Sequence, residues 1–575
     1  ACGCGNFLVI AYREIRRLEL RALELLYGKQ ANFTVAGMSR VTVDQFYGIE
    51  IDEFPARIAE VALWMMDHIT NNEVNLAFGL NYANIPLKGS PHILHGDALE
   101  ADWAAHLPPE KCTYVFGNPP FVGAKYQSER QRQQVRAIAR LGGSGGTLDF
   151  VTGWFIKAGQ YLQANNRIRI AFVATNSITQ GEQVAQLWPI LFDRYGLEIL
   201  FAHRTFSWTS EARGMAHVHV VIIGLTHRDN EPKEKRLFSY PDIKGDPVES
   251  RHEALTAYLF AARGITNRHL VVKEEGSPIN GARRLASGSQ PIDGGHLIFT
   301  SEQRAEFLAQ EPMASKWLRR YVGAEDFING GERWILALQG ASPSDLRAMP
   351  RVMDRLAEVR KFRSESQRES TLAIASQPTK FNVEVIPATP YLAVPEVSSE
   401  RRDYVPLGWL EPPTIPSNKL RLLPDATLFE FGVLTSRMHM AWLIFIGGRL
   451  KSDFQYGIGV VYNTFPWPEA NPGQRAKIEQ LAQAVLDARA AHPNASLADL
   501  YDPDTMPGDL RKAHAALDKA IDKLYRPTPF DSDRDRVEHL FGRYEALVSP
   551  MLRNAAAPRK RAPRSKAALA ARKDR

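Results

Sequence analysis

The stretch CTYVFGNPPF, residues 112–121, decides how the N-terminal part of this chain is expected to fold. Residues 112–117 form a short run of aromatic and β-branched side chains, which is typical of a buried strand. Proline cannot continue a central strand, so the chain must turn out of the sheet at Pro119. Asn118 is therefore expected at the C-terminal edge of a strand, where ligands bind in open α/β sheets.

Strand-like runs of the same kind alternate with helical stretches over residues 1–230. The runs are QFYGIEID (45–52), HILHGDAL (92–99), RIRIAFVATNSI (167–178), LEILFAHRTF (197–206) and HVHVVIIGL (217–225). Apolar residues at helical spacing predict crossover helices over residues 6–27 and 55–69. The alternation predicts an α/β domain with a mostly parallel, helix-covered sheet.

The remaining residues divide into four segments with different patterns. Residues 231–300 are polar and mixed, and we expect a connector with some helix. Residues 301–470 are dense in Pro, Arg, Trp and short apolar runs, which favours a second domain of the α+β class. Residues 471–550 carry amphipathic helical patterns. Residues 551–575 are rich in Ala, Pro, Lys and Arg and are expected to be a disordered basic tail.

Composition and charge exclude several classes of protein. The net charge is +7, but residues 553–575 carry nine Lys or Arg against one Asp, so the preceding residues are nearly neutral and global charge gives no evidence of DNA binding. No apolar run approaches the roughly 18–20 residues that span a bilayer, and a cytoplasmic protein is expected. Cys2, Cys4 and Cys112 have neither a disulfide pattern nor a zinc-like spacing, so no metal is expected.

Further polar residues and glycines occur near the other strand ends of residues 1–230. Gly3 and Gly5 permit a tight loop whose backbone can approach a ligand closely. Glu50 ends a predicted strand and could bind a ribose diol, although a solvated acid at a strand end is the alternative. Asp97 follows the next predicted strand and is suited to accept a hydrogen bond from an adenine amine.

The order of these motifs resembles that of class I S-adenosylmethionine-dependent methyltransferases that act on adenine in DNA. The resemblance implies a Rossmann-like sheet in which the glycine loop holds the methionine end of the cofactor, Glu50 the ribose and Asp97 the adenine. Asn118, Pro119, Pro120 and Phe121 match the family motif that holds the target base and carries catalysis. The implied cofactor-binding residues are Ala1, Cys2, Gly3, Gly5, Phe7, Glu50, Ile51, Asp97, Ala98 and Asn118.

The chemistry of methyl transfer explains these residue types. The exocyclic amine of adenine is a poor nucleophile because its lone pair is delocalised into the ring. Hydrogen bonds accepted by the Asn118 side-chain carbonyl and the Pro119 main-chain carbonyl would favour a tetrahedral nitrogen with an available lone pair. Such enzymes flip the base out of the duplex, and Phe121 and Phe206 are expected to stack on it, with Trp208 as a second candidate.

Other interpretations of single residues stay open at this point. Core packing is the alternative for Phe206 and Trp208. His217 and His219 lie on one face of a predicted strand and could suggest a metal-binding pair, but no carboxylate or third His lies at a suitable spacing. Asp149 matches a family position near the cofactor, and a helix N-terminal acid explains it equally well. Asn at the first motif position favours adenine, because Ser there is typical of cytosine-amine enzymes.

The residues behind the catalytic part are similar to those of MmeI-like (type IIL) restriction-modification enzymes. The matching stretches lie at 396–410 (EVSSERRDYVPLGWL), 439–469 (HMAWLIFIGGRLKSDFQYGIGVVYNTFPWPE) and 497–526 (LADLYDPDTMPGDLRKAHAALDKAIDKLYR), and the resemblance covers residues 1–550. It implies a DNA target-recognition domain at 301–470 and a double-stranded DNA partner. Arg401, Arg402, Arg449 and Lys451 are candidate DNA contacts, with surface ion pairs as the alternative.

Two alternatives to a DNA methyltransferase remain. Protein-glutamine methyltransferases share an Asn-Pro-Pro-Tyr motif, and that assignment would require residues after 300 to be unrelated to DNA recognition. A non-catalytic DNA-recognition remnant is the other alternative, because the chain starts inside the first motif and lacks the strand expected between YGIEID (47–52) and TYVFGNPPF (113–121). Without that central strand, we expect the fragment to fold poorly and to be inactive alone.

Overall fold

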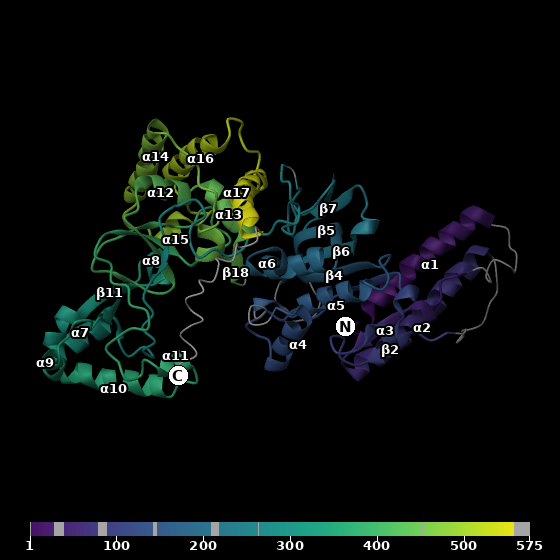
Figure 1. The fold of residues 1–575 in the computed structure, drawn as a ribbon, viewed down its shortest axis with the longest axis horizontal. Coiled ribbons are helices and arrows are strands. Elements are labelled where there is room, and N and C mark those ends of the chain that lie inside the picture. The colour runs from purple at the N-terminus through teal and green to yellow at the C-terminus, as the bar shows by residue number, and fades with distance from the viewer. Residues whose placement is uncertain are drawn as a thin grey trace, which may run out of the picture. The chain divides into compact units, whose positions relative to one another are not determined.

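The computed structural model describes residues 2–27, 39–78, 89–141, 147–208, 218–262, 264–450 and 452–556. The chain forms two compact units (Figure 1). Unit 1 comprises Ala1–Ala262 and Arg268–Val272, and unit 2 comprises Arg263–Asn267 and Lys273–Arg575.

Unit 1 alternates helices and strands, as the sequence pattern predicts. Its helices are α1 (Asn6–Tyr27), α2 (Glu53–Phe78), α3 (Trp103–His106), α4 (Glu129–Ala139), α5 (Thr152–Leu162) and α6 (Glu182–Pro189). Its strands are β1 (Tyr47–Glu50), β2 (His92–His95), β3 (Tyr114–Gly117), β4 (Arg169–Thr175), β5 (Leu197–Trp208), β6 (Val218–His227), β7 (Lys235–Ser239) and β8 (Val248–His252). Both predicted crossover helices are confirmed, since α1 has the predicted bounds and α2 contains residues 55–69.

The main sheet of unit 1 is mixed, which corrects the prediction of a mostly parallel sheet. Its strand order is β3-β4-β6-β5-β7-β8. The pairs β3–β4 and β5–β7 are parallel, whereas β6 runs antiparallel to both β4 and β5, and β8 runs antiparallel to β7. The physical reason is the length of the connections. A parallel crossover needs a dozen or more residues, and only residues 209–217 separate β5 from β6.

Strands β7 and β8 lie within the segment predicted as a connector, and the predicted boundary at residue 230 therefore falls inside the sheet. They occupy its edge, where β8 pairs with β7 only. Charged residues interrupt both of their sequences, KRLFS and VESRH, so they lack the apolar run of a buried strand. The predicted helix in this segment is absent from the described residues between 231 and 300.

Strands β1 and β2 form a separate parallel pair, so two strand edges lack a partner strand in the described part of unit 1. β1 pairs with β2 alone and β3 pairs with β4 alone. The Cys2 N–H donates to the Ile49 carbonyl at 3.0 Å, which places the start of the chain along the open edge of β1.

The start of α1 packs closely on α2, which makes Gly5 a sensitive position. Gly5 has φ +82°, and a Cβ there would lie 2.9 Å from the Ala59 Cβ. We expect Gly5→Ala to destabilise unit 1 by about 2–4 kcal/mol, through left-handed strain and overpacking. Gly3→Ala is the matched control, because Gly3 also has a positive φ but faces open space. Urea unfolding followed by hydrogen exchange in α1 tests this, and equal losses for both variants would contradict it.

Unit 2 is an α+β unit that ends in helices. Its helices are α7 (Ser301–Gln310), α8 (Ala324–Asn329), α9 (Pro343–Arg347), α10 (Pro350–Ser364), α11 (Glu369–Leu372), α12 (Leu428–Leu434), α13 (Arg437–Ile446), α14 (Pro472–Ala490), α15 (Leu497–Leu500), α16 (Gly508–Tyr525) and α17 (Asp533–Ala556). Its strands are β9 (Ala286–Ser287), β10 (Ile298–Thr300), β11 (Leu318–Val322), β12 (Arg333–Leu336), β13 (Tyr391–Pro395), β14 (Val397–Ser398), β15 (Gly408–Leu410), β16 (Ile415–Pro416), β17 (Leu420–Pro424), β18 (Gly448–Leu450) and β19 (Asp453–Gln455).

Three small sheets build the first part of unit 2. Their orders are β10-β12-β11-β16, β15-β13-β17-β9 and β14-β19-β18. The first sheet encloses a core with α7, α9 and α10, and residues such as Phe299, Ile335 and Leu356 are buried in it. Helices α14, α16 and α17 fall in the segment predicted to be helical. The disordered tail was predicted to begin at residue 551, whereas α17 continues to Ala556. The rest of that segment, residues 557–575, lies outside the described residues.

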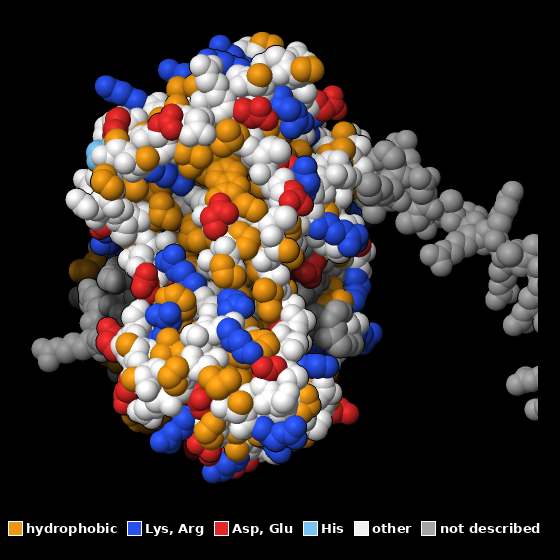
Figure 2. Space-filling model, turned by 90° about the vertical axis from the view of Figure 1, so that its left-hand side faces the viewer, with side chains coloured by type: hydrophobic (Ala, Val, Ile, Leu, Met, Phe, Trp, Pro, Cys, Tyr) orange, Lys and Arg blue, Asp and Glu red, His pale blue; other side chains and the backbone are white. Residues whose placement is uncertain are grey.

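The described helices and the face shown in Figure 2 give no sign of a membrane span or of a surface of one charge sign. No described helix is long and apolar enough to cross a membrane. On the face in Figure 2, Lys and Arg side chains are interspersed with Asp and Glu. Charge on this face therefore does not by itself mark a nucleic-acid footprint.

Candidate functional site

The motif at residues 118–121 leaves the sheet at the end of β3, as predicted. β3 ends at Gly117, and Pro119 is buried while Pro120 is exposed. Asn118 and Phe121 are half-buried. The Asn118 side-chain oxygen is buried and has no hydrogen-bond partner among the described residues. Because buried polar atoms are normally paired, this unpaired acceptor makes Asn118 a candidate for binding a donor group of a ligand.

The loop behind the motif is fixed by the segment that precedes α5. The Phe150 N–H donates to the Val122 carbonyl at 2.9 Å. The Gln127 side-chain amide donates to the Leu148 carbonyl at 2.8 Å. These bonds hold residues 122–127 in one conformation, so the motif at 118–121 is anchored at both ends.

Asp149 is a buried hydrogen-bond acceptor that joins three segments. Its carboxylate accepts from the Ala124 N–H at 3.1 Å, from the Thr175 hydroxyl at 3.1 Å and from the Ser177 hydroxyl. The Thr152 N–H at the start of α5 is bonded instead to the Asp149 main-chain carbonyl. The carboxylate therefore ties the loop after the motif to the end of β4, and helix capping alone does not explain this acid.

We expect Asp149→Ala to loosen the loop at 122–127, because it would leave one buried N–H and two hydroxyls without their acceptor. The expected loss is about 2–4 kcal/mol of unfolding free energy. Faster hydrogen exchange at residues 122–127 would report the local effect. Asp149→Asn keeps one acceptor oxygen and should cost less. Equal exchange in the wild type and the Ala variant would contradict the anchoring role.

The glycine loop lies against the end of β1 through Glu50. The Gly3 N–H donates to the Glu50 carboxylate at 2.7 Å, and the Asp52 N–H donates to its other oxygen at 3.4 Å. Glu50 is buried. A carboxylate offers about four acceptor positions, so Glu50 keeps capacity for two hydroxyl donors. Burial raises the pKa of the adjacent Cys2 thiol to about 11, which keeps it neutral beside this acid.

Two apolar side chains on the same segments are exposed. Ile51 is 54% exposed directly after Glu50, and Phe7 is 36% exposed in the first turn of α1. Single exposed apolar residues are ordinary, but these two flank the glycine loop and offer a surface for a planar or apolar ligand group. Ala1 lies outside the described residues, and Ala98 is buried.

Asp97 follows β2 in a loop that α4 and α5 hold from two sides. Its carboxylate accepts from the Leu99 N–H at 2.9 Å and from the Gln134 side-chain amide of α4 at 2.8 Å. From α5, the Lys157 ammonium donates to the Leu99 and Ala101 carbonyls at 2.7 and 2.6 Å. Burial lowers the pKa of Lys157, against the raising effect of Asp97 and two further acids.

Phe206 lies in β5, and its described contacts are with other aromatic side chains. It stacks on Tyr240 with ring centroids 4.8 Å apart. His203 donates to or accepts from the Tyr240 hydroxyl at 2.8 Å and stacks on Phe238. Phe206 is half-buried, so its role in base stacking stays a prediction. The Trp208 side chain and His217 lie outside the described residues.

The candidate DNA-contacting arginines cluster near β18 and β19 in unit 2, where protein groups already engage them. Arg401 forms ion pairs with Asp504 and Asp502. Arg449 lies over the Phe454 ring at 4.1 Å and donates to the Ser452 carbonyl at 3.1 Å.

Burial also shifts the pKa of two arginines in this cluster. Burial lowers the pKa of Arg402, and it lowers that of Arg449 to about 10. Lys451 lies outside the described residues. A DNA role for the cluster stays a prediction.

Sequence reasoning missed three residues that support the site, because none of them belongs to a recognisable motif. They are Gln127, Gln134 and Lys157. A local signal did exist for α4. Ser128 and Gln131 form a capping box, and this spacing marks a helix start in a sequence. It would have placed a helix start at Ser128, after the loop that follows the motif at 118–121.

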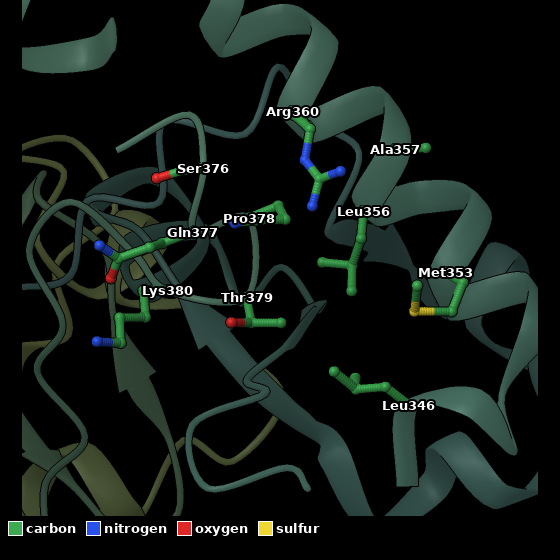
Figure 3. A pocket seen from close by; sticks show the side chains of 10 residues that line it. All are labelled: Leu346, Met353, Leu356, Ala357, Arg360, Ser376, Gln377, Pro378, Thr379 and Lys380. Atoms are coloured by element: carbon green, nitrogen blue, oxygen red, sulfur yellow. The ribbon is translucent and has the colours of Figure 1, made fainter. Parts of the chain in front are cut away.

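A separate cavity of about 340 Å³ in unit 2 contains none of the candidate site residues (Figure 3). Leu346 of α9 and Leu356 of α10 line it, together with Thr379 and Pro378 of the facing loop. Figure 3 shows Lys380 and Ser376 pointing away from its centre. It is a mainly apolar gap between α10 and the loop.

Comparisons with known proteins match almost the whole chain to one family. The family model described as MmeI, DNA-methyltransferase domain matches residues 1–239. The model of the MmeI target recognition domain matches residues 266–469, and that of the MmeI C-terminal domain matches residues 470–552. The family predicted from the sequence motifs is thereby confirmed.

Two relatives agree with the family models. The chain is 34% identical over 552 residues to DNA methyltransferase A of Bacillus subtilis (strain 168), covering 95% of this chain and 61% of that protein. It is 44% identical to the type IIL restriction-modification enzyme MmeI, whose structure was solved in complex with DNA. That match has a TM-score of 0.85 and covers 96% of this chain and 72% of the solved chain.

Proposed function

This chain belongs to the MmeI family, and from that premise we propose that it methylates the exocyclic amine of adenine in double-stranded DNA as part of a restriction-modification system. Unit 1 supplies the methyl-transfer site and unit 2 selects the DNA site. The observation that carries this proposal is the buried oxygen of Asn118 at the end of β3, which has no hydrogen-bond partner among the described residues. Because the proposed substrate is cellular DNA, we expect the protein to act in the cytoplasm.

The residues present fit S-adenosylmethionine as the methyl donor. The glycine loop has open space at Gly3, where a Cβ would meet nothing within 4 Å, and Gly96 before Asp97 is equally open. Glu50 has unused acceptor positions for ribose hydroxyls, and the exposed Ile51 can cover a ring face. The Asp97 carboxylate can accept from an adenine amine. When bound, this cofactor supplies an electrophilic methyl group.

The chain's own residues would prepare the target amine for attack. The Asn118 oxygen and the Pro119 carbonyl each accept a hydrogen bond from one N–H of the amine. This arrangement directs the nitrogen lone pair toward the methyl group. Pro119 and Pro120 restrict the backbone, so both acceptors are in place before the base arrives. Phe121 packs on the extruded ring and keeps water away from the amine. No strong general base is required, because the target amine becomes positively charged and acidic only as it receives the methyl group, and it then loses a proton readily.

Adenine is proposed as the target because Asn occupies the first position of the motif. The amide oxygen of Asn118 accepts from an amine, and an adenine flipped from the duplex presents this group on its Watson–Crick edge. The arginine cluster near β18 and β19 is proposed to contribute to DNA contacts. Its intramolecular ion pairs would have to rearrange or to be shared with phosphate groups.

Methyl transfer to DNA tests the proposal directly. The protein is incubated with methyl-labelled S-adenosylmethionine and genomic DNA from a strain that lacks adenine methylation, and the DNA is digested to nucleosides. We expect the label in N6-methyladenine. Label in a methylated cytosine would contradict the adenine assignment. If calorimetry shows cofactor binding but no label enters DNA, the proposed substrate is wrong. If the cofactor does not bind, the enzyme assignment is wrong and the alternative of a DNA-recognition protein is favoured.

A further inference from the structure

Gln134 of α4 holds the carboxylate that faces the proposed adenine end of the cofactor site. Its side-chain amide donates to Asp97 and to Glu100, each at 2.8 Å. The other Asp97 oxygen accepts from the Leu99 N–H at 2.9 Å. Two donors on different oxygens fix both the position and the plane of this carboxylate, while each oxygen keeps a second lone pair.

The chemistry of the position favours a neutral donor. Asp97 and Glu100 are two carboxylates that repel each other, and the amide of Gln134 bonds to both. Arg130 also pairs with Glu100 at 2.7 Å and with Asp97 at 3.6 Å. The Arg130 side chain is 67% exposed, whereas that of Asp97 is only 14% exposed. An exposed ion pair contributes little, so Gln134 is the stronger restraint on Asp97.

The position of Gln134 is set by the loop that carries the target-base motif. α4 begins directly after residues 118–127, and the Ser128 hydroxyl caps its Gln131 N–H while the Gln131 side chain bonds back to the Ser128 N–H. A capped helix start is fixed relative to the loop before it. The same segment therefore presents Asn118 at one end and supports Asp97 at the other.

We propose that Gln134 is a positioning residue that aims the Asp97 carboxylate at the 6-amino group of the cofactor adenine. This inference rests on the proposed function. The amide of Gln134 occupies one lone pair of the carboxylate, and the remaining lone pairs face the ligand in a fixed direction. Loss of the amide would leave Asp97 free to turn toward Arg130 or water, and recognition of the amine would weaken.

The test compares two ligands that differ only in the recognised amine. S-adenosylhomocysteine and its analogue with unsubstituted purine in place of adenine are titrated calorimetrically into the wild type and Gln134→Leu. The wild type should prefer the adenine ligand by roughly tenfold or more, as for a hydrogen bond to a charged group. Gln134→Leu should reduce this preference to about threefold or less and leave the affinity for the purine analogue nearly unchanged.

Gln133→Leu is the matched control, because Gln133 is the neighbouring exposed glutamine and donates to Glu129 instead. It should keep the full preference. With S-adenosylmethionine, Gln134→Leu should raise KM while kcat at saturation stays within about twofold.

Three outcomes separate the possibilities. A wild type without any ligand preference would contradict the proposed role of Asp97 itself. A wild-type preference that Gln134→Leu retains would overturn the inference about Gln134 alone. Equal losses in the Gln133 and Gln134 variants would show a general effect on α4 and would also overturn it.

Discussion

Replacing Asn118 by Ala is expected to lower the rate of methyl transfer to DNA by at least about a hundredfold, with cofactor binding retained. The side-chain oxygen of Asn118 is buried and has no hydrogen-bond partner among the described residues, so its removal breaks no hydrogen bond among them. What is lost is a preorganised acceptor for the target amine, and removal of one such polar group from a transition state typically costs 10²–10³ in rate.

Asn118→Asp is the informative companion variant, because it keeps an acceptor oxygen of nearly the same shape. It should retain a larger share of the rate than the Ala variant. Single-turnover transfer to a duplex, together with calorimetry of S-adenosylhomocysteine, separates chemistry from binding. A loss of cofactor affinity that accounts for the whole rate effect would contradict the role in activating the base. An Ala variant with the wild-type rate would contradict the site.

Local sequence patterns predicted the elements that position the site. The apolar spacing of residues 6–27 predicts α1 with its observed bounds, since each turn of this helix is determined by its own sequence. The proline pair after Gly117 ends β3 as expected. Glu50 was a candidate because an acid at this strand end can bind a ribose diol, and in the structure its carboxylate accepts from the Gly3 N–H of the glycine loop.

Features that depend on contacts across the chain were not predictable. The mixed sheet follows from pairings between strands whose order a single sequence does not specify. Strands β7 and β8 were missed because polar edge strands resemble loops. Gln134 was missed because its partner Asp97 lies 37 positions away, and no spacing rule connects a helix glutamine to a distant acid. The arginines near β18 looked available in the sequence, whereas Arg401 pairs with acids a hundred residues later.

The match to the target recognition domain also argues against one alternative that the Asn-Pro-Pro-Phe motif leaves open. A protein-glutamine methyltransferase would require residues after 300 to be unrelated to DNA recognition. Residues 266–469 match the MmeI target recognition domain, so that condition is not met. The remaining alternative is a recognition protein without catalysis, and cofactor titration is the measurement that separates it from a methyltransferase.

The largest effect on stability is expected at Arg363, a fully buried arginine in α10. Its guanidinium donates to five main-chain carbonyls at 2.8–3.1 Å, those of Pro291, Ile292, Ile374, Gln377 and Lys380. Burial lowers the pKa of this group, while Asp293 opposes the shift. The side chain thus joins the loop at 291–292 to the loop at 374–380.

Arg363→Ala should destabilise unit 2 by about 3–5 kcal/mol, because buried carbonyls that lose their donors retain their desolvation cost. Arg363→Lys should recover only part of this, since an ammonium has three donors and no planar fork. Urea unfolding with hydrogen exchange at residues 374–380 measures both effects. Arg360→Ala is the matched control, because Arg360 lies one turn earlier on the exposed face of α10.

Equal stability of the Arg360 and Arg363 variants would show that water satisfies the five carbonyls. A selective loss in the Arg363 variant would show instead that one buried cation holds the two facing loops against α10. A loop held by hydrogen bonds rather than by packing keeps its conformation only while the donor is present.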